Sequence, residues 1–318
     1  MKRWLWLLML ALGGAGLIAQ AQTTISVLEI EPGVQALGLG AAAVSLGETA
    51  ETLYYNPAAL AGLGGISFGS SYAVHLGLAN YTAFGLTFRN WGLGLLSLGS
   101  GDIPGYDEDG GSTDPLSYGS SAFLFGFGLK PSDLPFLPKL PIDFAVGGRL
   151  KYLSLTSGTV KGSGFGVDLA YRMTFPDMRL GPIALSGLAL GVTATNLMSS
   201  VAYDGGHTER LRMSIRAGGS GLVSGIVLVA TDLDLGGSVH VGTEYRPAKG
   251  FAVRAGLMTQ PGGIAVTLGL GVDVSGFVVD YAFQSHPELG AIHRVSLTLD
   301  FSAIDLTAIS RSLGRLIR

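Results

Sequence analysis

The feature that most constrains the fold of this chain is an alternation of ionic and apolar side chains with a period of two residues. Arg149 and Lys151 fall on one face of the stretch 142–153 if that stretch is extended. Leu150 and Tyr152 then fall on the opposite face. Because successive side chains of a β-strand point to opposite sides, the pattern predicts strands with one ionic face and one apolar face.

Fourteen stretches are predicted to be strands. They cover residues 65–74, 79–89, 91–99, 118–130, 142–153, 163–175, 183–196, 208–219, 223–231, 237–246, 250–259, 262–273, 276–285 and 291–301. Most exceed the ~5–6 residues common in soluble proteins and approach the ~9–11 that a transmembrane strand needs. The even number is also typical of membrane barrels. The sequence therefore predicts an all-β fold, a transmembrane antiparallel β-barrel of about 14 strands, with a soluble β-sandwich as the alternative.

The charged face of these strands is expected to line the lumen of the barrel. An Arg that faces lipid at the middle of a bilayer costs about 2–4 kcal/mol, so the apolar face must meet the lipid. The predicted lumen-lining residues are Arg149, Asp168, Arg172, Arg212, Arg216, Glu244, Arg254, Asp280 and Arg294. A barrel of this size encloses more space than its own side chains fill. We therefore expect a plug or a bound ligand, for which the 50 glycines of the chain leave room.

The first 21 residues have the features of a cleaved export signal. Lys2 and Arg3 precede an apolar run over 4–18, and Ala19-Gln20-Ala21 fits the small-x-small cleavage rule. The apolar run is short for a spanning helix of ~20 residues, which disfavours the alternative of an N-terminal membrane anchor. The predicted location is the outer membrane, with outer-membrane lipid as a partner.

The composition and the motifs exclude several classes of function. There is no Cys, and the net charge of -3 with no basic run argues against nucleic-acid binding. The five His have no metal-ligand spacing, and no G-x-S-x-G motif occurs. The predicted loop 99–117 is acidic, but its spacing differs from that of an EF-hand, which favours a solvated surface loop over a calcium site. We expect neither an enzyme nor a cofactor or metal.

Two parts of the sequence together resemble one known family. The first is 33–46, continued by Tyr54-Tyr55-Asn56-Pro57-Ala58, and the second is 279–283 followed by 293–297. They resemble the PorV/PorQ family, a branch of the FadL-like outer-membrane barrels. There the Asn-Pro-Ala element belongs to an N-terminal hatch folded into the barrel. The resemblance thus implies a hatch over 22–63 with the motif Asn56, Pro57 and Ala58, and a barrel over 64–301. A periplasmic leader is the alternative for the hatch.

The same resemblance implies a function. FadL-like barrels bind or transport hydrophobic or amphipathic small molecules across the outer membrane. PorV-like relatives instead serve secretion or surface-protein assembly, so an exported or envelope protein is an alternative partner, and a purely structural barrel is a third reading. Residues 302–318 extend beyond the last strand of relatives. Their pattern predicts a short basic amphipathic helix in the periplasm, with a frayed tail as the alternative.

Overall fold

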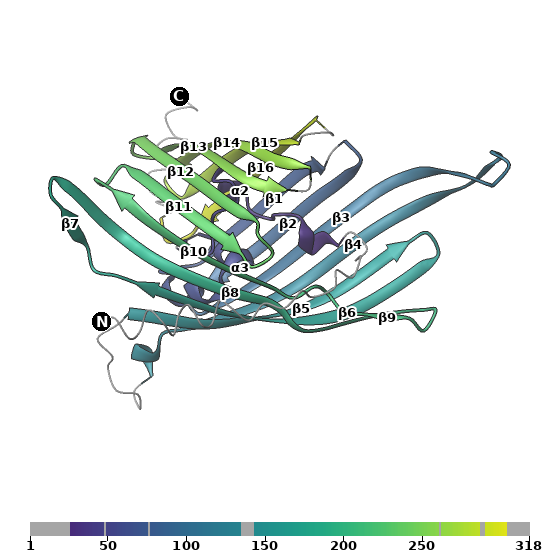
Figure 1. Ribbon diagram of the computed structural model, residues 1–318, viewed down its shortest axis with the longest axis horizontal. Helices are drawn as coiled ribbons and strands as arrows, with labels where there is room; N and C mark the ends of the chain where they lie inside the picture. The colour runs from purple at the N-terminus through teal and green to yellow at the C-terminus, as the bar shows by residue number, and fades with distance from the viewer. Residues whose placement is uncertain are drawn as a thin grey trace, which may run out of the picture.

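The computed structural model describes residues 26–47, 49–75, 77–134, 143–260, 262–286 and 290–303. The predicted signal 1–21 lies outside these residues, as does the predicted tail beyond residue 303. Within them, fourteen long strands form a closed antiparallel β-barrel around a short N-terminal segment (Figure 1). The predicted fold class and number of barrel strands are confirmed.

The barrel strands fall into two groups by length. Nine strands have 8–12 residues: β1 (Ser67–His75), β2 (Ala79–Phe88), β10 (Ser214–Val223), β11 (Val227–Asp234), β12 (Val239–Ala248), β13 (Phe251–Gln260), β14 (Gly263–Val274), β15 (Phe277–His286) and β16 (Gly290–Asp300). Five strands have 15–21 residues: β3 (Trp91–Tyr106), β4 (Ser112–Leu129), β5 (Asp143–Ser157), β6 (Val160–Thr174) and β8 (Ile183–Tyr203). Two short strands, β7 (Met178–Leu180) and β9 (Thr208–Glu209), pair with the two ends of β8.

The barrel closes because β1 and β16 pair, from Ser67 opposite Asp300 to Ala73 opposite Arg294. β8 and β10 also pair directly. The short strands β7 and β9 pair only with the ends of β8 and do not lie between these two strands. Each of the fourteen long strands therefore has a neighbour on both sides. Closure pairs the backbone groups that would otherwise be left unsatisfied in lipid.

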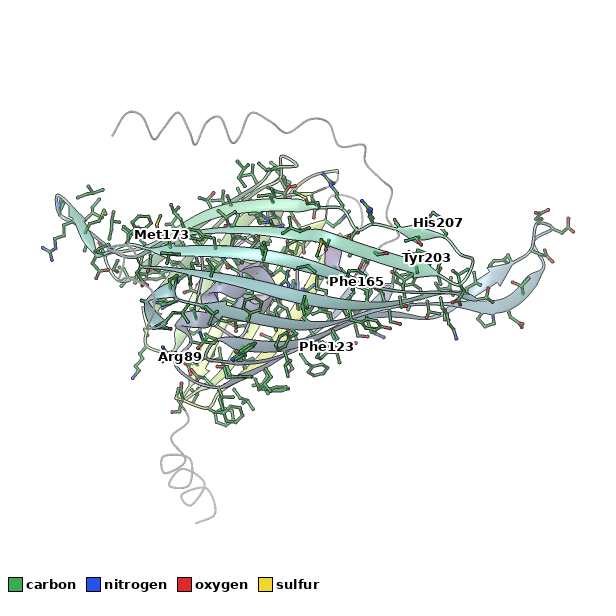
Figure 2. All side chains as sticks on the ribbon, turned by 90° about the horizontal axis from the view of Figure 1, so that it is seen from below. Arg89, Phe123, Phe165, Met173, Tyr203 and His207 are labelled. Atoms are coloured by element: carbon green, nitrogen blue, oxygen red, sulfur yellow. The ribbon has the colours of Figure 1, made fainter. Side chains whose placement is uncertain are left out.

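The two faces of the wall follow the predicted alternation. Phe123 and Phe165 point away from the barrel and are about half-exposed (Figure 2). Ala122 and Leu124, on either side of Phe123, are buried in the interior. The same outward apolar pattern recurs along the other strands. A continuous apolar outer face is suited to acyl chains rather than to water, as expected of a transmembrane barrel.

The five strands of 15–21 residues extend well past the length that a bilayer needs. Three loop predictions are wrong for that reason. In place of the predicted loop 99–117, β3 and β4 leave only the turn 107–111 between them. The predicted strands 142–153 and 163–175 implied a loop between them, but β5 and β6 leave only 158–159. The predicted strands 183–196 and 208–219 likewise implied a loop over 197–207, most of which belongs to β8. Beyond the bilayer no lipid face has to be apolar, so the alternation fades although the strands remain paired.

The N-terminal segment, defined here as residues 26–63, lies inside the ring of strands (Figure 1). It contains η1 (Val27–Glu29), α2 (Val34–Gly38), α3 (Thr52–Tyr55) and η2 (Pro57–Gly62). Another short helix, η3 (Pro131–Asp133), follows β4. The segment is apolar and buried, with Val27, Val34, Leu37, Leu53 and Leu60 fully removed from solvent. No helix among the described residues is long and apolar enough to cross a membrane.

Candidate functional site

The N-terminal segment crosses the inner face of the wall where the wall carries glycine. A Cβ added at Gly256 would overlap the backbone nitrogen of Gly40. A Cβ added at Gly242 would overlap the carbonyl group of Leu39. Gly147 meets the backbone of Ala58 in the same way. We call Gly242, Gly256 and Gly147 the glycine seats. They let two backbones approach within van der Waals contact, which any larger residue would prevent.

Two buried polar side chains on neighbouring strands bind the segment after α2. Asp232 of β11 accepts hydrogen bonds from the amides of Ala43 and Val44, at 2.8 and 3.0 Å. His240 of β12 lies opposite Asp232 in register, and its Nδ1 is 2.8 Å from the carbonyl oxygen of Gly40. Because a carbonyl oxygen only accepts, this contact assigns a proton to Nδ1. The wall thus satisfies backbone groups that the non-helical stretch would otherwise bury unpaired.

Asn56 connects the segment to the wall. Its Oδ1 accepts from the amide of Ala58 at 3.0 Å and so caps η2. Its Nδ2 donates to the carbonyls of Val44 and Tyr171, at 2.6 and 3.1 Å. Pro57 follows at the start of η2, where its missing N–H costs nothing. The Asn56-Pro57-Ala58 motif therefore connects three places: the stretch at Val44, the start of η2, and β6 at Tyr171.

Glu51 fixes the start of α2. Its two carboxylate oxygens accept from the amides of Gln35 and Ala36, at 2.9 and 3.0 Å. Removal from water raises the pKa of the Glu51 carboxyl, and the two backbone donors oppose that rise. The residue therefore holds α2 against α3 within the lumen.

A cavity of about 480 Å³ lies between the segment and the wall. Its apolar side is formed by Leu96 of β3, Leu124 of β4 and Leu28 of η1. Its polar side comes from β5, β8, β10 and β11 and includes Arg149, Lys151, Thr193, Thr195, Asn196, Ser214, Arg216 and Asp234. The volume is within the ~300–1,000 Å³ usual for small-molecule sites. The cavity is therefore large enough for a ligand with both apolar and polar groups.

Two cations on the cavity wall share one buried carboxylate. Arg149 and Lys151 of β5 contact Asp168 of β6, at 2.6 and 2.7 Å. Arg149 also donates to the carbonyl of Leu53 at 2.8 Å, which links this group to the segment. Asp168 accepts a further bond from the amide of Asn196 at 2.8 Å. These bonds hold both cations in place on the strands.

A second charged group lies beside α2. Arg254 of β13 contacts Glu244 of β12 and Asp280 of β15, both at 2.6 Å. The side chain of Arg254 packs against Gly38, at the end of α2. Every one of these charges is paired inside the wall, as burial requires. This group therefore packs against the segment, and none of its three residues lines the cavity.

An ion pair also joins the segment to the wall at the cavity. Glu31 contacts Arg216 of β10 at 3.2 Å. The carbonyl oxygen of Glu31 accepts from the guanidinium of Arg294, which lies 4.7 Å from the centre of the Tyr81 ring. Both guanidinium groups thus meet the same residue of the segment, one at its carboxylate and the other at its backbone.

The residues predicted to line the lumen fall into three places. The cavity is lined by Arg149, Arg212 and Arg216, and Asp168 lies behind it as the partner of Arg149. The charged group beside α2 consists of Glu244, Arg254 and Asp280. The backbone of the segment is bound by Arg172, at the carbonyl of Ser45, and by Arg294, at the carbonyl of Glu31. Arg212 precedes β10, because that strand begins at Ser214 and not at 208 as predicted.

Asp232 and Asn196 were missed by sequence reasoning. The predicted strand 223–231 ended one residue before Asp232, although the period of two puts Asp232 on the same inward face of β11 as Ala230. Asn196 lies in a bulge of β8 with φ 58°, and a single Asn gives no periodic signal. Among the described residues, no group of three or more His, Cys, Asp or Glu side chains is placed to hold a metal ion.

Comparisons with known proteins show similarity at the level of fold. No family model and no curated protein matches the chain. Among solved structures, the toluene transporter TodX of P. putida is 14% identical, with a TM-score of 0.53 over 85% of this chain and 99% of that chain. The deltaS2 mutant of the TodX monoaromatic hydrocarbon channel is 13% identical, with a TM-score of 0.44 over 84% and 96%. A mutant porin of Rh. blastica is 11% identical, with a TM-score of 0.33 over 74% and 98%. Of these three, the first alone exceeds 0.5, and at such low identity it shows a shared fold only.

Proposed function

We propose that this protein is an outer-membrane channel that binds hydrophobic or amphipathic small molecules and passes them across the membrane. The cavity between the segment and the wall is the observation that carries the proposal, because its leucine side removes apolar groups from water. The N-terminal segment would act as the hatch. The shared fold with a toluene transporter supports an apolar or partly apolar ligand.

The outer-membrane location has its own test. The apolar outer face of the barrel and the predicted export signal support it. We expect the protein to sediment with outer membranes and to migrate faster on a gel unboiled than boiled, as folded barrels do. Equal migration of boiled and unboiled samples from a membrane extract would contradict a membrane barrel.

Binding of uncharged amphiphiles tests the function directly. For protein in lipid nanodiscs, we expect the affinity to rise from butanol to hexanol to octanol, by about 0.8 kcal/mol for each buried CH₂ at most. Calorimetry against empty nanodiscs measures this affinity. Leu96→Ser, within the cavity, should weaken octanol binding by about 1 kcal/mol or more, because it removes apolar contact area.

Leu95→Ser is the matched control. Leu95 is the preceding residue of β3 and faces outward, with 45% of its surface exposed. We expect it to leave octanol binding unchanged. The secretion-component and structural alternatives predict no octanol binding beyond that of empty nanodiscs, so the same titration separates them from the proposed channel.

A further inference from the structure

We propose that residues 304–318, which we call the tail, form an interfacial helix that binds the anionic phospholipid surface on the periplasmic side of the membrane. The inference does not depend on the proposed channel function, because it concerns the part of the chain that follows the last barrel strand. The tail lies beyond the described residues. Its sequence and the described end of β16, which precedes it, together carry the inference.

The sequence of the tail separates apolar from basic residues when it is placed on a helix of about 100° per residue. Five large aliphatic side chains fall on one side: Leu306, Ile309, Leu313, Leu316 and Ile317. Three guanidinium groups fall on the opposite side: Arg311, Arg315 and Arg318. The preceding Ser302-Ala303-Ile304-Asp305 fits the [ST]-x-x-[DE] signal for the start of a helix. A helix with one apolar and one basic face is typical of segments that lie in the plane of a membrane surface.

The turns of the barrel identify the end at which the tail begins. β16 ends at Asp300, on the side where 89–90, 249–250 and 275–276 join neighbouring strands as two-residue turns. On the opposite side, β3 and β4 extend as a long hairpin. Because outer-membrane barrels have short periplasmic turns and longer external connections, the tail begins at the periplasmic end.

Aromatic side chains mark the membrane surface at this same end. Four strands carry an exposed aromatic residue as their last or first residue here: Phe88 of β2, Trp91 of β3, Phe251 of β13 and Phe277 of β15. Phe301, directly after β16, is 52% exposed, and its amide donates to the carbonyl of Ile66 at 2.9 Å. Aromatic girdles lie at the level of the lipid head groups. The chain therefore leaves the barrel wall at that level.

A turn after β16 ends the strand at the membrane surface. Asp300 Oδ1 accepts from the amide and the hydroxyl of Ser302, at 3.0 and 2.6 Å, and the Asp300 carbonyl accepts from the amide of Ala303 at 3.1 Å. As a helix, the 15 residues that follow would be about 22 Å long, which is less than the ~30 Å of a hydrocarbon core. Such a helix lies along the surface, with its aliphatic side among the acyl chains and its arginines among the phosphates.

Spin labelling tests the position of the tail in the intact protein. The chain has no Cys, so a nitroxide label can be attached at a single introduced position. Leu313→Cys labels the aliphatic side, and Thr307→Cys labels the arginine side as the matched comparison. In nanodiscs of phosphatidylcholine and phosphatidylglycerol in equal parts, we expect the label at 313 to be immobilised. It should be relaxed more by oxygen, which concentrates among acyl chains, than by a water-soluble nickel chelate, with the reverse preference at 307.

Arg315→Gln, combined with the label at 313, tests the role of charge. We expect the ratio of immobilised to mobile label to fall about fivefold, which is what one Arg near an anionic surface contributes to binding. Nanodiscs of phosphatidylcholine alone should lower the ratio further, because they remove the attraction of all three arginines. Arg179→Gln is the control, since it removes the same charge from β7, which pairs with β8 and not with β16. It should leave the ratio unchanged, and a mobility shift on boiling verifies that each variant is folded.

Two other outcomes would overturn the inference. A label at 313 that is mobile in both kinds of nanodisc would mean that the tail is frayed. A label at 313 that is equally immobilised in both, and shielded from oxygen, would mean that the tail contacts protein, either the mouth of the barrel or another chain. Neither outcome bears on the proposed channel function, which the octanol titration tests separately.

Discussion

Two parts of the N-terminal segment are held in the lumen by different kinds of contact. Residues 37–61, which we call the body, cross the glycine seats, where backbone meets backbone. Residues 26–32, which we call the hook, cross none of the glycine seats, and most of them line the cavity together with Val44, Tyr54 and Tyr55 of the body. The hook meets the wall through side chains. Val27 and Ile30 pack in a buried apolar cluster with Leu96 and Leu124, the amide of Val27 donates to Ser120 Oγ at 3.1 Å, and the carboxylate of Glu31 contacts Arg216.

This difference separates what must stay in place from what can exchange. A backbone in a glycine seat has no side chain to rearrange and no space for water to enter, so it leaves only if the wall itself moves. A hydrogen bond at the edge of a cavity can be replaced by one to water or ligand at little net cost. The body is thus suited to sealing the lumen, and the hook is suited to responding to a ligand.

Gly256→Val gives the sharpest test of the seats and the largest expected effect. The added side chain would overlap the backbone of Gly40, and a backbone cannot be relieved by a rotamer change. We expect a destabilisation of about 3 kcal/mol or more, at the upper end for overpacked cores. Liposomes with the variant should leak small solutes, and the body should become cleavable by added protease.

Gly119→Val is the control for that experiment. A Cβ added at Gly119 meets no atom within 4 Å, so the substitution should change neither the leak nor the cleavage. If Gly256→Val and wild type leak equally, the body is not the seal of the lumen.

Asn56→Ala is expected to have the next largest effect on the body. The substitution removes the cap of η2 and leaves the carbonyls of Val44 and Tyr171 without that donor. The loss of a cap and of buried partners predicts about 1–3 kcal/mol of destabilisation. A solute-leak assay should show a rise smaller than that of Gly256→Val. Asn80→Ala, at an exposed position of β2, should stay within about 0.5 kcal/mol of wild type.

The barrel wall was predictable because the membrane imposes a rule on every residue of a crossing strand. An ionic side chain such as Arg254 must face the lumen, and its neighbour Val253 must face lipid. Ionic and apolar residues therefore alternate along the sequence with a period of two. The rule ends where the bilayer ends. The outer parts of β3 and β4, up to Tyr106 and from Ser112, were therefore predicted as a loop although they are paired strands.

The path of the N-terminal segment was not predictable in the same way. Its residues show no sustained period, and its contacts depend on glycines that lie far apart in the chain, such as Gly147 and Gly256. Their small size was visible in the sequence, but which backbone each one meets is fixed only when the barrel closes. The cavity and the contact of Glu31 with Arg216 arise from that closure, so single-residue patterns could not reveal them.

Ser120→Ala has the smallest expected effect and tests whether the hook moves independently of the body. Ser120 Oγ accepts from the amide of Val27, and the loss of this one hydrogen bond should cost about 0.5–1.5 kcal/mol. Hydrogen exchange should become faster at Val27 and stay unchanged at Ala43 and Val44, which Asp232 still binds. Ser121→Ala, the next residue of β4, is the matched control and should change neither. Faster exchange at all three amides in Ser120→Ala would mean that the segment opens as one body, and the distinction between hook and body would then be wrong.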